Sequence, residues 1–251
     1  MSSFIECFWT SELESGSPFQ RRVLPDGCMD ILFDFATAAN SPASVIGTMT
    51  RPLNVVIAHR VDLLGVRFRP GALSNFMSFD GVELLDARVD LANFWGRFAE
   101  ELCGRLSEAA PINRISVLET ALARRANARS KRDPFVEHCV KRIETANGAL
   151  RIADLERSSG LTSRQIERKF ARCLGISPKM FSRIIRFKRV AAAAGPRARD
   201  WAGLAAAFGF ADQPHLVREF KAFSGSTPVE HFAEAHETAR HVEFIQDVQI
   251  F

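Results

Sequence analysis

Apolar positions recur at helical spacing through the C-terminal half of the chain. Within residues 152–232 the same pattern of residues occurs twice. The first copy carries Leu155, Gly160, Ile166, Arg168, Phe170, Gly175 and Pro178, and the second carries Leu204, Gly209, Leu216, Arg218, Phe220, Gly225 and Pro228. The offset is 49 residues up to the first glycine and 50 afterwards. Self-similarity at a fixed offset indicates a repeated supersecondary unit.

Each copy predicts two short helices joined by a turn at a glycine. Gly160 and Gly209 end the first helix of their copies, where glycine tolerates left-handed backbone. Thr162 stands three residues before Gln165, the spacing of a capping box, and Asp212 is a good N-cap. The second helix buries an apolar stripe and leaves a polar, basic face outward. This arrangement is typical of a helix-turn-helix.

A plain helical bundle with solvated charges is the alternative for one copy alone, but two copies in matching register favour paired helix-turn-helix units. Ser177-Pro178 predicts the start of a long helix between the units, ending at Gly195-Pro196. Its stiffness would set the separation of the two units, which can share one face of DNA near a spacing of about 34 Å. Helices are also predicted over residues 135–147 and 228–235.

The pattern of residues 1–88 predicts short strands separated by turns. With the helices that follow, we expect the chain to have an α+β fold. The predicted strands are Phe4–Trp9, Asp30–Phe35, Val45–Gly47, Val55–Ile57 and Arg60–Arg69, with a turn at Pro25-Asp26-Gly27 and a short helical stretch at Ala72–Met77. We expect a small antiparallel barrel or sandwich, followed by helices over 90–107 and from Pro111. The resulting domains are 1–128, a linker at 129–133, 134–235 and a tail at 236–251.

Positive charge is concentrated where the repeat lies. Residues 1–132 hold 15 basic and 15 acidic side chains, whereas residues 133–235 hold 17 basic against 11 acidic. The tail holds one against three, and the whole chain carries a net charge of +4. A basic domain beside a neutral one is what binding to a phosphate backbone would need, although an ordinarily basic surface gives the same count.

The cysteines argue against a disulfide framework and a zinc finger. Five are present, an odd number, and no two stand at C-x-x-C spacing. We expect reduced thiols, no cofactor and no metal, with a cytoplasmic location. The sequence shows neither a leader pattern nor a run of ~18 apolar residues, so no membrane partner is expected.

The region 135–235 resembles the DNA-binding domain of AraC/XylS-type transcription regulators. The resemblance rests on Ile166–Phe170, Gly175–Pro178, Phe181 with Arg186, Gly209–Lys221 and Gly225–Pro228. It implies seven helices, two of which enter successive major grooves, and a sequence-specific regulator that is not an enzyme. It implies double-stranded DNA as partner and RNA polymerase as a further candidate. The DNA-contacting positions that it implies are Ser163, Arg164, Glu167, Arg168, Gln213, Pro214, His215 and Arg218.

Pro214 departs from the family pattern, which often has a polar residue there. Proline is comfortable in the first turn of a helix, but it cannot hydrogen-bond a base edge. Arginine can read guanine, glutamine can read adenine, and glutamate can accept from cytosine N4. We therefore expect the first unit to carry more base specificity than the second. Lys169, Arg172, Lys179, Arg183, Arg186, Lys188 and Arg189 are candidates for phosphate contact or structural salt bridges.

Residues 1–130 resemble the N-terminal region of a subgroup of these regulators, on Leu24–Ile31, Gly65–Gly71 and the helix that contains Trp95. Sibling families have a cupin-like domain here that binds an effector and dimerises. A small-molecule effector, sensed through residues 1–88, and a second copy of the chain are therefore candidate partners. No effector-binding residue can be named, and the comparison is one of architecture.

Three rival readings remain weaker. A DNA-repair alkyl acceptor fused to an AraC-type domain needs a cysteine cluster, whereas Cys7 and Cys28 are isolated. A cupin metal site could use Cys28, Asp30 and His59, but the two-histidine strand motif is missing. An architectural or RNA-binding module fits paired helix-turn-helix units less well than duplex DNA does. The apolar tail 240–251 either adds a strand to the first domain or stays disordered.

Overall fold

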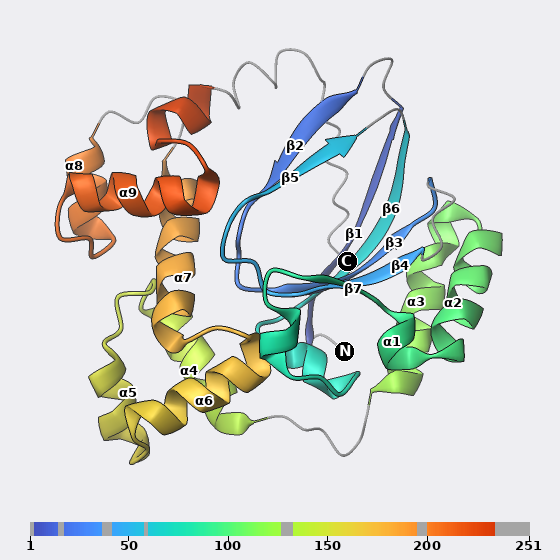
Figure 1. Cartoon of the computed structure of the whole chain (residues 1–251), viewed down its shortest axis with the longest axis horizontal. Helices are drawn as coiled ribbons and strands as arrows, with labels where there is room; N and C mark the ends of the chain where they lie inside the picture. The colour runs from blue at the N-terminus through green and yellow to red at the C-terminus, as the bar shows by residue number, and fades with distance from the viewer. Residues whose placement is uncertain are drawn as a thin grey trace.

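The structure, a computed structural model, describes residues 3–14, 18–36, 42–57, 60–126, 133–194 and 200–233 (Figure 1). The strands lie in the first part of the chain and a purely helical part follows, which confirms the predicted α+β architecture of two regions. The predicted linker up to residue 132, His59 and the tail 236–251 lie outside the described residues. The predicted domain boundaries there stay predictions.

The first part is built on an antiparallel sheet with a separate ribbon. The sheet has the order β1 (Ile5–Glu14), β6 (Arg60–Phe68), β3 (Met29–Asp34), β4 (Ala43–Ile46), β7 (Arg88–Asp90), and the ribbon pairs β2 (Phe19–Val23) with β5 (Leu53–Ile57). Side chains alternate in β3, where Met29, Ile31 and Phe33 are buried. Among the described strands, no pairing joins β1 to β7 and closes a barrel. The predicted strands are present, but β2 and β7 were not predicted.

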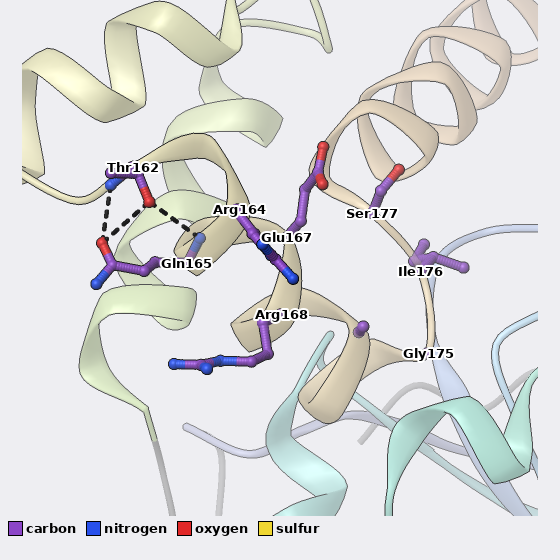
Figure 2. Close-up of a pocket in the computed structure, with 9 residues that line it drawn as sticks. Thr162, Arg164, Gln165, Glu167, Arg168, Gly175, Ile176 and Ser177 are labelled. Carbon is purple, nitrogen blue, oxygen red and sulfur yellow. Dashed lines mark hydrogen bonds between the residues drawn. The ribbon is translucent and has the colours of Figure 1, made fainter.

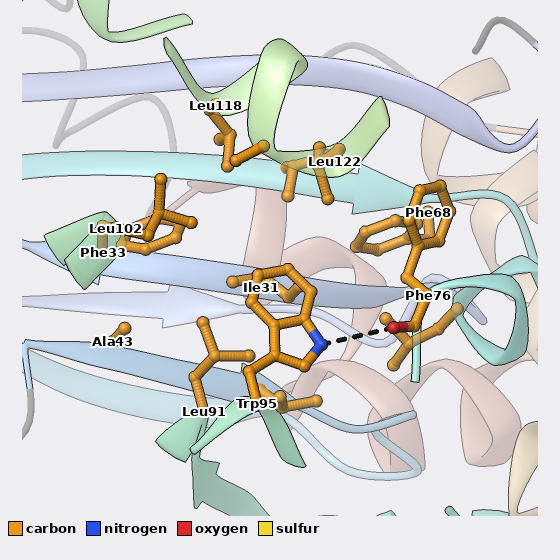
Figure 3. Close-up of a cluster of buried hydrophobic side chains, with 14 of the residues drawn as sticks. Ile31, Phe33, Ala43, Phe68, Phe76, Leu91, Trp95, Leu102, Leu118 and Leu122 are labelled. Carbon is orange, nitrogen blue, oxygen red and sulfur yellow. Dashed lines mark hydrogen bonds between the residues drawn. The ribbon is translucent and has the colours of Figure 1, made fainter. Parts of the chain in front are cut away.

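Three helices cover the sheet and complete the first core. These are α1 (Ala92–Trp95), α2 (Arg97–Glu108) and α3 (Pro111–Arg125). Figure 3 shows Trp95 among the side chains of sheet and helices, where its indole Nε1 donates to the Phe76 carbonyl at 3.3 Å. The single helix predicted over 90–107 is wrong, because Gly96 has a φ of 53° and breaks it in two.

The helical part contains α4 (Pro134–Thr145), α5 (Ile152–Ser159), α6 (Ser163–Leu174), α7 (Pro178–Ala193), α8 (Trp201–Ala207) and α9 (Gln213–Ser224). A further helical stretch over 228–233 agrees with the predicted closing helix as far as the described residues extend. These helices share one apolar core, in which the repeat-equivalent Phe170 and Phe220 are buried. The predicted stop of α7 at Gly195-Pro196 lies outside the described residues.

Two short 3-10 helices, η1 (Ala72–Asn75) and η2 (Gly81–Leu84), connect β6 to β7. The predicted helical stretch at Ala72–Met77 corresponds to η1, whereas η2 was not predicted. In the part of the chain that the structure describes, every helix is too short or too polar to cross a membrane.

Candidate nucleic-acid interface

The first helix-turn-helix unit consists of α5 and α6, with Gly160 between them in left-handed backbone at a φ of 69°. The predicted capping box is confirmed: the Gln165 side chain accepts from the Thr162 backbone N–H at 2.9 Å, and Thr162 Oγ1 accepts from the Gln165 N–H at 3.4 Å. The Ser163 N–H donates to Glu156 on α5 at 2.6 Å. The start of α6 is thus held from both sides of the turn.

The outward face of α6 carries three of the side chains predicted to contact DNA. Arg164, Glu167 and Arg168 are exposed, and no hydrogen bond or ion pair with another described residue occupies them. They line a groove of about 590 Å³, together with Thr162, Gln165, Ala171, Gly175, Ile176 and Ser177 (Figure 2). Figure 2 shows the two arginine side chains extending from α6, with the Glu167 carboxylate on the side nearer α7. Ser177 is the N-cap of α7 that the sequence predicted, and its hydroxyl accepts from the Met180 N–H at 3.1 Å. Its place in the wall of the groove was not predicted.

The second unit consists of α8 and α9 and begins its recognition helix differently. Asp212 accepts from the His215 N–H at 2.6 Å, as predicted for an N-cap. Gln213, Pro214 and Arg218 are exposed, whereas His215 is half-buried. The His215 Nδ1 accepts from the Ala211 N–H at 3.2 Å. Only Nε2 of this ring is left to face a ligand, and in the neutral ring it carries the proton.

Several cations proposed for phosphate contact have internal partners instead. Arg183 on α7 donates to both carboxylate oxygens of Glu219 on α9, at 2.7 and 2.8 Å. Lys169 pairs with Asp133, the N-cap of α4. For these two side chains the structure favours the salt-bridge alternative, because each contacts an acidic side chain of another helix or helix cap. Both partners lie 36 residues away in sequence.

Arg186 belongs to the same structural group. Its guanidinium donates to the Gly209 carbonyl at 3.2 Å and lies 5.2 Å from the centre of the Phe210 ring. Burial lowers the pKa of Arg186. By contrast, Arg172, Lys179 and Arg189 are exposed and remain candidates for phosphate contact.

The cluster around Cys28 is built as an ion-pair network. The Cys28 thiol donates to Glu6 Oε2 at 3.1 Å, and Arg67 holds Asp30 through two hydrogen bonds at 3.1 and 3.0 Å. Burial, reinforced by the charge of Asp26, raises the pKa of Cys28 well above its ordinary value, so the thiol stays protonated. Within the described residues, no group of three or more histidine, cysteine or acidic side chains is arranged to hold a metal ion.

Figure 1 shows α7 running between α6 and α9, so that each recognition helix lies near one end of it. The repeat explains why both recognition helices lie against α7. Phe170 of α6 and Phe220 of α9 occupy equivalent positions of the repeat, and both are buried in the core that α7 shares. The spacing of about one DNA turn between the two reading faces stays a prediction.

Comparison with known proteins agrees with this geometry. A family model described as a helix-turn-helix domain matches residues 155–234. Residues 155–234 therefore form a helix-turn-helix domain. The match supports the resemblance to AraC-type regulators for this region. A second model, a domain of unknown function called DUF6597, matches residues 1–90, while the subgroup suggested by Leu24–Cys28 stays a prediction. A search of curated proteins finds no match.

Solved structures that match the chain include ToxT from Vibrio cholerae, at 11% identity and a TM-score of 0.49 over 91% of this chain and 98% of that one. ToxT bound to an unsaturated fatty acid shows 12% identity and a TM-score of 0.43 over 92% and 97%. A probable AraC family transcriptional regulator from Rhodopseudomonas palustris shows 26% identity and a TM-score of 0.36 over 41% and 98%.

Proposed function

We propose that this protein is a sequence-specific transcription regulator that reads two successive major grooves of duplex DNA with α6 and α9. The observation that carries the proposal is the pair of capped helix-turn-helix units, built on one core, each with an exposed polar face on its second helix. A helix-turn-helix places the N-terminal residues of its second helix against base edges. The groove beside α6 runs from Thr162 at the N-cap of the helix to Gly175 at its C-cap, so it includes that end.

In the first unit, the chemistry of the exposed face suits direct reading of bases. Arg164 and Arg168 can each donate two hydrogen bonds to O6 and N7 of guanine. Glu167 stands between them in sequence and can accept from cytosine N4. Because other described residues occupy none of the three, no intramolecular bond among them must break before DNA binds.

In the second unit, fewer groups remain for bases. Gln213 can pair with adenine and Arg218 with guanine, while His215 offers a donor at Nε2. Pro214 offers no donor at all. We propose that the second unit contributes affinity and spacing, with a smaller share of base discrimination. Arg172, Lys179 and Arg189 would add contacts to phosphates that do not depend on sequence.

The experiment that tests this function is selection of bound sites from randomised duplex DNA by the full-length chain. The expected result is a site with two half-sites about 10 base pairs apart, one of them better defined than the other. Raising the salt concentration should weaken binding steeply, because several phosphates are neutralised. A chain that selects no duplex site, or whose affinity does not change with salt, would contradict the proposal.

We also propose that residues 1–88 respond to a small molecule, as the resemblance implies. Thermal unfolding of the full-length chain, followed against a panel of metabolites, is the first measurement. A ligand that binds only the native state raises the unfolding temperature, and the rise grows with the logarithm of ligand concentration above the Kd. Recruitment of RNA polymerase and formation of a homodimer are further proposals, tested by transcription from the selected site and by sedimentation.

A further inference from the structure

The first part of the chain contacts both helix-turn-helix units at equivalent positions of the repeat. Gly175 ends α6 and Gly225 ends α9, and both have left-handed backbone, with φ values of 76° and 83°. Gly81 of η2 packs against the first of these turns, and Arg22 and Pro52 at the β2–β5 ribbon pack against the second. Two elements of one region thus hold the ends of both recognition helices.

The contact at α6 is made by backbone against backbone. A Cβ placed on Gly81 would lie 2.5 Å from both the Ala171 oxygen and the Gly175 nitrogen. A Cβ placed on Gly175 would lie 2.4 Å from the Gly81 oxygen. Neither position accommodates a side chain without movement. The last turn of α6 therefore packs backbone against backbone on η2, with no room for a methyl group between them.

The contact at α9 uses a side chain. Arg22 on β2 donates to Ser226 Oγ at 3.1 Å and to Asn54 Oδ1 at 3.4 Å. A Cβ on Gly225 would lie 3.4 Å from the Pro52 ring. The buried Ser224 hydroxyl lies 2.8 Å from the Phe220 carbonyl oxygen and 2.7 Å from that of Ser226, and its single proton can be donated to either. It also accepts from the Ser226 N–H at 3.4 Å, so it ties this turn to the end of α9.

A third contact lies between these two, on α7. Gly27, in left-handed backbone at a φ of 83°, packs so closely on Phe181 that a Cβ there would lie 2.7 Å from the ring. Its loop is held by Arg67, which pairs with Asp26 at 2.9 Å and with Asp30. Figure 1 shows the loops of the first region reaching toward α7 between α6 and α9. The predicted turn at Pro25–Gly27 is therefore a docking element.

From these contacts we infer that the first region is a spacing clamp, which sets the separation and angle of α6 and α9 and so selects the spacing of DNA half-sites. The inference rests on the proposed reading of DNA. Both recognition helices pack with α7 in one core, and a tilt of either helix against α7 would change the distance between the two reading faces. Contacts from the first region to the C-terminal ends of both helices restrict this tilt before DNA binds. A protein whose two reading faces are preorganised at one separation binds best to half-sites at the matching spacing.

The test compares Gly81→Ala with Gly104→Ala in the full-length chain. Gly104 lies within α2, and a Cβ there meets nothing within 4 Å, so it controls for the added methyl group. The two selected half-sites are placed in duplexes at spacings of about 9 to about 13 base pairs, beside a duplex with one half-site. Wild type and Gly104→Ala should bind one spacing ~10-fold tighter than its neighbours. Gly81→Ala should lose most of this preference and keep its affinity for the single half-site.

Arg22→Ala provides a second variant, which removes a side chain and adds no bulk. It should weaken the spacing preference in the same direction, by a smaller factor. Hydrogen exchange should rise at residues 172–177 in Gly81→Ala and at residues 223–228 in Arg22→Ala. An unchanged spacing profile in a variant whose exchange has risen would overturn the clamp, since α7 alone would then set the spacing. If wild type binds no duplex, the proposed function fails first; if it binds without any spacing preference, only the clamp fails.

Discussion

The two helix-turn-helix units share a scaffold but differ in the side chains that their recognition helices expose. The buried positions match, as Phe170 and Phe220 show, and each helix ends at a left-handed glycine. On the exposed faces, α6 presents Arg164, Glu167 and Arg168 beside a groove, whereas α9 presents Gln213, Pro214 and Arg218. A repeat can therefore keep the buried residues that form its core while the exposed residues proposed to contact bases differ, because the two sets lie on opposite faces of the same helix.

The largest expected effect tests the shared scaffold. Phe170→Ala and Phe220→Ala each remove a fully buried ring from the common core, and each should lower the free energy of unfolding by ~3–5 kcal/mol. Urea unfolding followed by circular dichroism measures the change. Because both rings belong to one core, each variant should destabilise both units in a single transition. Two separate transitions would show that the units fold independently.

The next effect concerns the reading faces. Arg168→Ala and Arg218→Ala should each weaken binding to the selected site by ~1–3 kcal/mol, with the larger loss at Arg168. The reason is that α6 offers a fuller set of base partners than α9. Binding is measured on the selected site and on random duplex DNA.

Equal losses on selected and random DNA would assign an arginine to the phosphate backbone. A larger loss for Arg218 than for Arg168 would reverse the ranking of the two units. Arg105→Ala is a matched control, since this exposed arginine belongs to α2, which Figure 1 shows on the opposite side of the molecule from α6 and α9.

Local signals in the sequence were enough to predict the units themselves. The turn at Gly160 and the caps at Thr162 and Asp212 depend on residues within a few positions of one another. The exposed faces followed from helical periodicity in the same way. These features need no knowledge of the rest of the chain, so the repeat could be interpreted before the fold was known.

Long-range partners could not be predicted. The ion pair of Arg183 with Glu219 spans 36 residues, so a candidate phosphate contact proved to be an internal brace. The short strand β7 and the helix η2 carry too few residues for a periodic signal. The docking of Gly27 on Phe181 depends on the approach of two regions far apart in sequence. A turn signal predicts the turn, but it does not indicate what the turn packs against.

The caps allow a subtler comparison of the units. Thr162→Ala removes the hydroxyl that accepts from the Gln165 N–H, and Asp212→Ala removes the carboxylate that accepts from the His215 N–H. Each should lower the free energy of unfolding by about 1 kcal/mol. Thr162→Ser and Asp212→Asn should recover most of it, because both can still cap. An alanine variant as stable as wild type would mean that water replaces the cap at that helix.

The smallest effect is expected at Pro214, where the two units differ most in chemistry. Pro214 is exposed in the first turn of α9, where its missing N–H has no helical partner to lose. Pro214→Ala should therefore change the free energy of unfolding by less than ~0.5 kcal/mol and leave the selected site unchanged. Pro214→Gln adds donors and an acceptor at the same place. If the second unit reads few bases because proline stands there, selection with this variant should define one further base pair in its half-site. An unchanged half-site would place the limit elsewhere, in the bonded Nδ1 of His215 or in the tie between Glu219 and Arg183.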